Sequence, residues 1–412
     1  MKQGTLSDYF IGVGTKVLKG TEVDPDVSNG HELQGVDAFR EFLGTPAEKQ
    51  LIPVTYVWLS DDAEPLSARS TGTWYDSRRG KPHRTAEYRL YYPAVVEEII
   101  RRARADDRLF LCLPKHAPLL ALFCERGSSI EQQLHWLFGL EPNQLTDIEQ
   151  KDFRSDRGRE LDIAARYILE LINVEVAPPE DERLGQLVAR FKRKFPSTRE
   201  FSKFARAHTR DVDAATDPDG ALVRWMDMEE RLFLMLEKQI VGPRLEQGFL
   251  NGSEPDVDGF IQYSLQVQNR RKSRAGWAFA NHIEELLIVH KVRYVREATT
   301  EKRNGPDFLF PGEAEYHDPS WPAARLTMLA AKTSCKDRWR QVLKEAHRIE
   351  GKHLVTLEPG ISPTQTTEMK SEHLKLVVPA LLQNSYQTEQ RAELMRVTDF
   401  LQMILERQQR RF

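Results

Sequence analysis

The sequence is poor in cysteine and has no long apolar run. Its 412 residues include only three cysteines, Cys112, Cys124 and Cys335, and this odd number without metal-ligand spacing predicts reduced thiols and a cytoplasmic protein. No apolar run approaches the ~20 residues that a membrane span needs. The N-terminal stretch MKQGTLSDYFIGVG lacks the apolar core and the small-residue cleavage site of a signal peptide, so we expect no signal peptide.

The chain also lacks a large excess of charge of one sign. It carries 59 Lys plus Arg against 62 Asp plus Glu, a formal net charge of −3, which by itself argues against a generally basic nucleic-acid binder. The distribution is uneven, because the segment from Leu265 to Lys352 has 17 Lys plus Arg and 11 Asp plus Glu. A local basic surface on an acidic chain favours a polyanionic ligand, although a solvated charged face remains the alternative.

The pattern of apolar residues predicts an α/β protein in two parts. The Pro-containing acidic stretch VEVAPPEDERLG, residues 174–185, is the best linker, which divides the chain into residues 1–175 and 176–412. In the first part we expect strands at 51–60, 88–93 and 109–114, and helices at 94–107, 128–140 and 156–172.

The second part opens with helices and continues as a mixed sheet flanked by helices. We expect helices at 186–196, 198–209, 221–240, 257–267, 276–290, 337–350, 363–370 and 387–409. Strands are expected at 292–298, 307–310, 326–331, 353–357 and 374–379.

Two charged residues stand at the ends of apolar runs in this second part. Lys332 ends the run at 326–331, and Asp307 begins the short run after Pro306. A buried ammonium is costly unless it is paired, so we expect the two side chains to lie side by side at the rim of the sheet. A carboxylate that holds Mg²⁺ beside a lysine suits metal-assisted phosphodiester hydrolysis, as in the PD-(D/E)XK nucleases. That pattern is broken here by Ala330, and a turn-capping Asp307 with a solvent-reaching Lys332 is the alternative.

Several longer stretches resemble the catalytic domain of the EcoRII-type restriction endonucleases, from about Phe195 to the C-terminus. They are NRRKSRAG (269–276), PDFLFPG (306–312), EYHD (315–318), KTSCKDRWRQVLKEA (332–346) and HLVTLEPGIS (353–362). The resemblance implies that Asp307 and Glu345 are metal ligands and that Lys332 and Lys336 are active-site lysines. A further family glutamate falls on Ala280, so this chain departs there, and Glu284, one helical turn later, could replace it.

A cationic cluster precedes the helix expected at 276–290. It consists of Arg270, Arg271, Lys272 and Arg274, and the uncharged Asn269 stands directly before them. All five are candidates for DNA binding, with Arg224 as a weaker one. The resemblance implies that Asn269 and Arg271 face bases and that the other side chains contact the backbone of DNA. Phosphate binding alone would also explain so many cations.

The first part of the chain does not resemble the effector-binding domain that we expect in front of such a catalytic domain. Its stretch SRRGKPHRTAEYRLYYP, residues 77–93, interleaves cations with aromatic residues, which suits contact with phosphates plus stacking. The candidates are Lys81, Arg84, Tyr91 and Tyr92. The YYP segment faintly resembles the sulfur-binding domains that recognise phosphorothioate DNA. A second effector-DNA or regulatory domain, or a purely structural hairpin, are the alternatives.

These features predict an Mg²⁺-dependent, sequence-specific endonuclease of double-stranded DNA, a type II restriction enzyme in which the first part of the chain senses DNA. Cutting both strands of a near-palindromic site predicts a homodimer. The alternatives are a modification-dependent restriction endonuclease and a DNA-binding protein that has kept the nuclease fold without its activity. Retention of Asp307, Lys332 and Glu345 together argues against the second of these.

Overall fold

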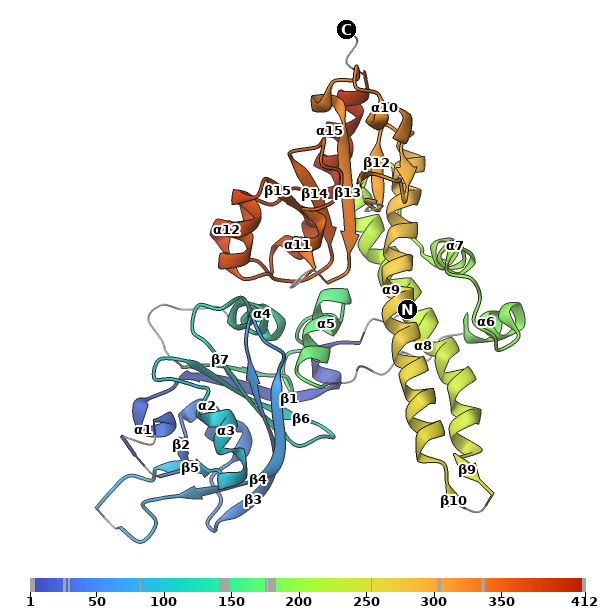
Figure 1. Cartoon of the computed structure of the whole chain (residues 1–412). Helices are drawn as coiled ribbons and strands as arrows, with labels where there is room; N and C mark the ends of the chain where they lie inside the picture. The colour runs from blue at the N-terminus through green and yellow to red at the C-terminus, as the bar shows by residue number, and fades with distance from the viewer. Residues whose placement is uncertain are drawn as a thin grey trace.

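The chain is built around two sheets, each covered by helices, which confirms the expected α/β class (Figure 1). The computed structural model describes residues 4–24, 27–28, 30–81, 83–140, 148–174, 176, 183–252, 254–301, 305–334 and 338–409. Among these residues no helix combines the length and the apolar character that crossing a bilayer would need.

The first sheet has eight strands in the order β2-β5-β4-β3-β7-β6-β1-β8. Their bounds are β1 Phe10–Val17, β2 Glu32–Gln34, β3 Gln50–Leu59, β4 Leu66–Asp76, β5 Tyr88–Tyr91, β6 Arg108–Pro114, β7 Leu119–Cys124 and β8 Ile148–Asp152. Neighbouring strands pair antiparallel except β3 and β7, which are parallel. The strands expected at 51–60 and 109–114 correspond to β3 and β6.

Both faces of this sheet are covered, because alternate side chains of its central strands enter two separate cores. On β6, Phe110 and Cys112 pack with α4 (Ser129–Phe138) and α5 (Ile163–Leu171), whereas Leu109 and Leu111 pack in the core that holds α2 (Asp37–Leu43) and α3 (Glu97–Ile100). The short α1 (Gly20–Val23) lies at the side of the sheet.

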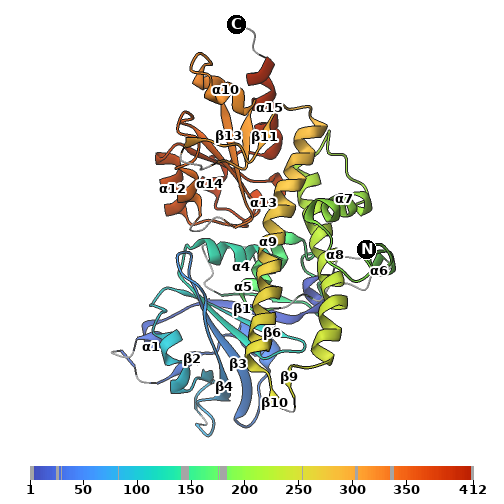
Figure 2. The same ribbon diagram turned by 45° about the vertical axis from the view of Figure 1, so that its right-hand side comes forward.

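A helical layer joins the first sheet to the second. It comprises α6 (Arg183–Phe191), α7 (Thr198–His208), α8 (Pro218–Glu246) and α9 (Val257–Val289). The two long helices begin at aspartate caps, since the Asp217 carboxylate accepts from Gly220 N at 2.8 Å and that of Asp256 from Gly259 N at 2.9 Å. They run side by side, and a small two-stranded ribbon of β9 (Leu250–Asn251) and β10 (Glu254–Pro255) connects the end of α8 to the start of α9, as Figures 1 and 2 show.

The second sheet has five strands in the order β11-β12-β13-β14-β15. These are Val295–Arg296, Phe308–Phe310, Thr327–Lys332, Lys352–Thr356 and Leu374–Val377; the first three pair antiparallel and the last three parallel. The C-terminal half of α9 shares its core with α11 (Trp339–Val342), α12 (Pro363–Ser371) and α15 (Val397–Gln409). The short helices α10 (Glu313–His317), α13 (Ala380–Gln383) and α14 (Thr388–Arg391) complete this part.

Six expected helices differ from those observed. The segments 257–267 and 276–290 are one helix, α9, because no proline lies between them and Gly276 costs only about 1 kcal/mol against alanine. The cationic cluster is therefore part of a helix instead of preceding one. The helices expected at 94–107, 156–172 and 337–350 are wrong in length, since only Glu97–Ile100, Ile163–Leu171 and Trp339–Val342 are α-helical. The helix expected at 387–409 is wrong in being continuous, since α14 ends at Arg391 and α15 begins at Val397.

The two parts of the chain are joined by hydrogen bonds that link the start of α4 and the loop after β3 to residues that follow β14. Ser129 Oγ donates to Ile361 O at 2.9 Å, and Gln387 Nε2 donates to Gly127 O at 2.7 Å. Gln365 Nε2 donates to Asp62 Oδ1 at 3.2 Å. The carboxyl ends of β13 and β14 therefore lie on the side of the second sheet that faces the first (Figure 1).

Candidate active site

Asp307 and Lys332 form an ion pair at the rim of the second sheet. Asp307 directly precedes β12, and Lys332 is the last residue of its antiparallel neighbour β13. One carboxylate oxygen, Asp307 Oδ2, accepts from Lys332 Nζ at 2.9 Å and from Ala331 N at 2.7 Å. Both side chains remain partly exposed, so the pair is fixed by the sheet but open to a ligand.

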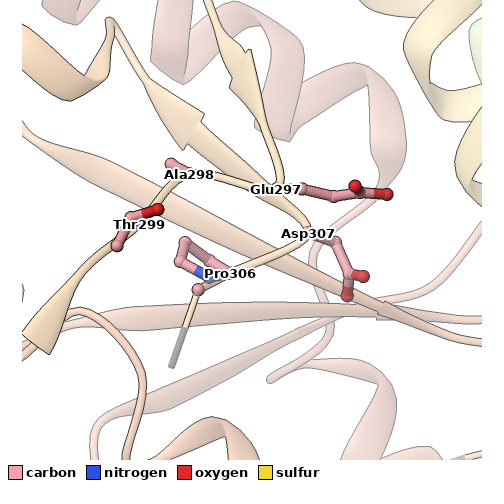
Figure 3. A pocket seen from close by; sticks show the side chains of 6 residues that line it. Glu297, Ala298, Thr299, Pro306 and Asp307 are labelled. Carbon is pink, nitrogen blue, oxygen red and sulfur yellow. The ribbon is translucent and has the colours of Figure 1, made fainter. Parts of the chain in front are cut away.

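A cavity of about 440 Å³ lies beside Asp307, lined by residues 297–299 and 305–307 (Figure 3). The backbone N–H of Glu297 donates to Asp307 O at 3.1 Å, which places the two acids opposite each other across neighbouring strands. In Figure 3 both carboxylates extend to the same side. Sequence reasoning did not single out Glu297, whose position opposite Asp307 follows from the antiparallel pairing of β11 with β12.

Glu345 belongs to the same electrostatic site. It lies on the turn after α11, and its atom Oε2 is buried without a hydrogen-bond partner among the described residues. Burial raises the pKa of the Glu345 carboxyl to about 7; the Lys332 charge opposes this shift and the Asp307 charge adds to it. The short α11 brings the acid back to the sheet.

The donor atoms of this site fit a single Mg²⁺ ion. Asp307 Oδ1 and the unpaired Glu345 Oε2 are carboxylate oxygens, the ligand type that Mg²⁺ prefers. Three or more acidic, His or Cys side chains arranged to hold a metal do not occur in the described part of the chain. Two carboxylates suffice, because Mg²⁺ in phosphoryl-transfer sites keeps several waters and binds substrate phosphate.

The structure gives Glu284 other partners. Its carboxylate binds Arg296 Nη1 at 2.7 Å, Arg199 Nη1 at 3.3 Å and the Tyr294 hydroxyl at 3.2 Å. No contact recorded among the described residues joins Glu284 to Asp307, Lys332 or Glu345. Lys336, the second lysine of the expected site, lies outside the described residues.

Arg271 is oriented by a buried acid of the neighbouring helix. Glu237 Oε2 on α8 accepts from Arg271 Nε at 2.8 Å and from Nη2 at 2.5 Å. The Glu237 side chain is nearly fully buried, whereas about half of the Arg271 side chain is exposed. Glu237 thus occupies one edge of the guanidinium and leaves the Nη1 side for a ligand.

The other residues of the second part that we expected to contact DNA lie in different environments. Asn269, Arg270 and Lys272 are exposed on α9, and the Arg270 guanidinium lies 4.3 Å from the centre of the Phe195 ring. Arg274 is buried and paired with Glu229 and Glu230, so its side chain is not exposed for the expected contact with DNA. Arg224 is half-exposed and pairs with Asp217 at 2.7 Å.

Residues 81–92 divide into surface and core. Lys81 and Arg84 are exposed in the turn between β4 and β5, and Tyr91 at the end of β5 is 40% exposed. Tyr92 is buried, and its hydroxyl donates to Glu22 O at 3.2 Å. The prediction that Tyr92 contacts DNA is therefore wrong, because its side chain is part of the core.

Comparison with known proteins identifies the C-terminal part of the chain. Residues 233–401 match the family model described as EcoRII C terminal. The type II restriction enzyme EcoRII of Escherichia coli is 41% identical over 231 residues, which cover 56% of this chain and 53% of EcoRII. The match thus spans about half the length of this relative.

Two solved structures are similar in part. Metal-depleted Ecl18kI in complex with uncleaved, modified DNA has a TM-score of 0.44 at 17% identity, covering 57% of this chain and 85% of its own. The PspGI–substrate DNA complex has a TM-score of 0.43 at 16% identity, covering 52% and 93%. From the family model and the EcoRII match, the resemblance seen in the sequence is confirmed over residues 233–401, which match the EcoRII C-terminal model.

Proposed function

We propose that this protein is an Mg²⁺-dependent, sequence-specific endonuclease of double-stranded DNA, a type II restriction enzyme that acts in the cytoplasm as a homodimer. The Asp307–Lys332 pair, with the buried Glu345 beside it, carries this proposal, because it lies within the residues that match the EcoRII C-terminal model. The identity to EcoRII, named as a type II restriction enzyme, supports the same reaction.

In this proposal each residue has a separate task in phosphodiester hydrolysis. Mg²⁺, when bound, would polarise the phosphate and lower the pKa of a water molecule. Asp307 and Glu345 would hold it. Lys332, oriented by Asp307 Oδ2, would donate to the phosphate and position the attacking water as negative charge develops on phosphorus-bound oxygens. The new P–O bond forms with the water oxygen as the bond to the leaving sugar oxygen breaks.

We further propose that residues 1–175 sense DNA and that residues 176–412 cut it. Exposed Lys81, Arg84 and Tyr91 support contact of the first part with a polyanion. On the second part, Arg271 is the best candidate for reading a base, since its guanidinium is held in one orientation while its outer side stays open.

Digestion of plasmid DNA tests the proposal. The full-length protein is incubated with unmodified, methylated and phosphorothioate-containing plasmid, with Mg²⁺ or with EDTA, and the ends are sequenced. We expect discrete fragments with a common end sequence only when Mg²⁺ is present. Cleavage of only a modified plasmid would make the enzyme modification-dependent. Binding to duplex DNA without cleavage of any of the three would leave a non-catalytic DNA-binding protein.

A further inference from the structure

Lys352 is a buried lysine to which the proposed reaction gives no task. It is the first residue of β14, it is 6% exposed, and no ion pair of its ammonium group is recorded among the described residues. Its Nζ atom donates to Ile349 O at 2.6 Å and to Ala346 O at 3.4 Å. An ammonium taken out of water is costly unless it is hydrogen-bonded or paired. The group is therefore satisfied by the turn of residues 345–349, which carries Glu345.

This turn is also held by residues outside the sheet. The Glu301 carboxylate accepts from His347 N at 3.2 Å. The Arg348 guanidinium donates to two carbonyl oxygens of the loop 318–321, each at 2.9 Å. The backbone of Lys352, in contrast, is paired with β15. Lys352 is therefore the residue that ties the turn to the second sheet itself.

The backbone of the turn needs such support directly after Glu345. Ala346 has a φ of 47°, in the left-handed region that residues with a side chain rarely adopt. A conformation of this kind persists only where the surrounding contacts impose it. The hydrogen bond from Lys352 Nζ to the carbonyl of Ala346 is one of these contacts. The direction in which the Glu345 side chain leaves the backbone thus depends on Lys352.

Lys352 and Lys332 project from the same face of the second sheet. Alternate residues of a strand line one face, so Lys352, Leu354 and Thr356 share a face of β14. Thr356 pairs with Lys332 of the parallel strand β13, which places Lys332 on that face about 13 Å along the strands from Lys352. Both ammonium charges lower the pKa of the Glu345 carboxyl against the effect of burial. Glu345 is therefore within electrostatic reach of both lysines.

We propose that Lys352 is a positioning residue of the active site: its ammonium group fixes the turn of residues 345–349 so that the Glu345 carboxylate faces Asp307 and Lys332. This inference rests on the proposed function, because it takes Glu345 as a ligand of Mg²⁺. Lys352 itself touches neither the metal nor DNA in this role. Loss of a group that orients a metal ligand typically weakens metal binding by about 10–100-fold.

Binding of Mn²⁺ to the metal-depleted full-length protein, without DNA, tests the inference by electron paramagnetic resonance of the free ion. The binding event at the site is the one that Asp307→Asn removes. Lys352→Met keeps the apolar stem but removes the charge and the N–H donors, so its affinity for Mn²⁺ should fall about tenfold.

The matched control separates positioning from a loss of stability. Val355→Ala removes buried methyl groups on the opposite face of β14. It should lower the melting temperature, because it leaves a cavity in the core, yet bind Mn²⁺ as the wild type does. If Lys352 only stabilised the fold, the two variants would behave alike.

Arg348→Met provides a second variant. It releases the same turn from the loop 318–321 at a partly exposed position, so the fold should tolerate it. Its Mn²⁺ affinity should also fall, and it decides the question if Lys352→Met does not unfold cooperatively.

Plasmid cleavage over a series of Mg²⁺ concentrations gives an independent measurement. Lys352→Met should raise the half-saturating Mg²⁺ concentration about tenfold and approach the wild-type rate once Mg²⁺ saturates, because the groups that contact DNA and metal are all retained.

Three results would overturn the inference. They are wild-type Mn²⁺ affinity in Lys352→Met or, if that variant is not folded, in Arg348→Met; an equal loss of affinity in Val355→Ala; and a wild-type protein that binds no Mn²⁺. The first two leave the nuclease proposal standing, whereas the third also removes the metal site. A protein that binds Mn²⁺ with the expected pattern but cuts no DNA would remove the nuclease proposal alone.

Discussion

Lys332 Nζ lies 2.9 Å from Asp307 Oδ2, and the backbone N–H of Ala331 donates to the same oxygen. The antiparallel pairing of β12 with β13 brings these groups together, so the geometry is set by the sheet and not by flexible side chains. The remaining oxygen of Asp307 is thereby left for a metal or a water molecule.

The first prediction follows from this pair. Asp307→Asn and Lys332→Ala should each abolish Mg²⁺-dependent plasmid cleavage, because one removes a proposed metal ligand and the other the group proposed to position the water. DNA binding, measured by electrophoretic mobility shift, should survive. The control is Asp318→Asn, an acid that bonds to Ser320 in the same part of the chain. Cleavage by either site variant at the rate of this control would place the active site elsewhere.

The Asp307–Lys332 pair could be predicted from sequence, whereas its neighbours could not. An apolar run that ends in lysine and a Pro-Asp before another apolar run are local signals of two adjacent strand ends. Glu345 lies in the turn that follows α11, which ends at Val342, and no glycine or proline in the sequence near Val342 predicts that the helix ends there. The acid was therefore expected on a longer helix, and its role came from the family resemblance alone.

Long-range packing explains the other differences. Gly276 and the cations before it look like a break between helices, yet α9 is continuous and packs against α8. Arg274 reads as a surface cation, but acids on α8 bury and pair it. Tyr91 and Tyr92 look equivalent in sequence, although neighbours in extended backbone face opposite sides, and only Tyr91 is outside.

The second prediction concerns the pKa of Glu345, which is about 7 in the folded protein against an ordinary value of 4.5. Between these values the folded carboxyl keeps its proton while the unfolded one ionises, so the wild-type free energy of unfolding should fall as pH rises from 4.5 to 7. Glu345→Gln stays neutral and should therefore gain stability relative to the wild type over that window, by less than about 3 kcal/mol.

Urea unfolding of the metal-free protein at several pH values measures this difference. Glu350→Gln, a change at an exposed acid of the same segment, is the control and should follow the wild type at each pH. Adding Mg²⁺ should stabilise the wild type more at pH 8 than at pH 6, because the ion needs the ionised carboxylate. A difference between Glu345→Gln and wild type that does not vary with pH would contradict the raised pKa.

A third prediction separates base reading from phosphate binding on α9. Arg271→Lys keeps the charge beside Glu237 but loses the planar fork of the guanidinium. In an Asp307→Asn background, binding to the duplex that the wild type cuts should weaken by about 1–3 kcal/mol, with little change on random duplex. Lys272→Gln, which removes an exposed point charge, should weaken binding to both duplexes alike. Equal weakening by Arg271→Lys on both would make Arg271 a phosphate contact.

The fourth prediction concerns the turn between β4 and β5. In the full chain carrying Asp307→Asn, the variant K81Q/R84Q should bind DNA more weakly and with a shallower salt dependence, by about 0.9 in the logarithmic slope for each lost phosphate contact. Arg101→Gln is the control, since Arg101 is an exposed cation that pairs with Glu97 away from this turn. An unchanged salt slope in K81Q/R84Q would remove the turn from the DNA interface.

Substitutions of Tyr91 and Tyr92 should have different effects on DNA binding and on the melting temperature. Tyr91→Ala should reduce discrimination between phosphorothioate and plain DNA without lowering the melting temperature, since the side chain is 40% exposed. Tyr92→Ala should lower the melting temperature, because it removes a buried ring and its hydrogen bond to Glu22 O. If Tyr91→Ala leaves discrimination unchanged, the modified group is not read at this surface.

The last prediction tests how the backbone places Asp307. A Cβ atom on Gly305 would lie 2.0 Å from the backbone carbonyl oxygen of Ala298, a residue that lines the same cavity. Gly305→Ala must therefore push Pro306 and Asp307 away from Ala298, which would displace the carboxylate from Lys332 and Ala331. Displacements of about 1 Å at a catalytic group can cost up to about 10²-fold in rate, so cleavage should fall at least tenfold.

Gly351→Ala is the matched control, because its Cβ would meet nothing within 4 Å. Thermal unfolding distinguishes local displacement from global damage: both variants should melt close to the wild type, and only Gly305→Ala should lose activity. Full activity in Gly305→Ala would show that the position of Asp307 does not depend on the close approach of these two strands.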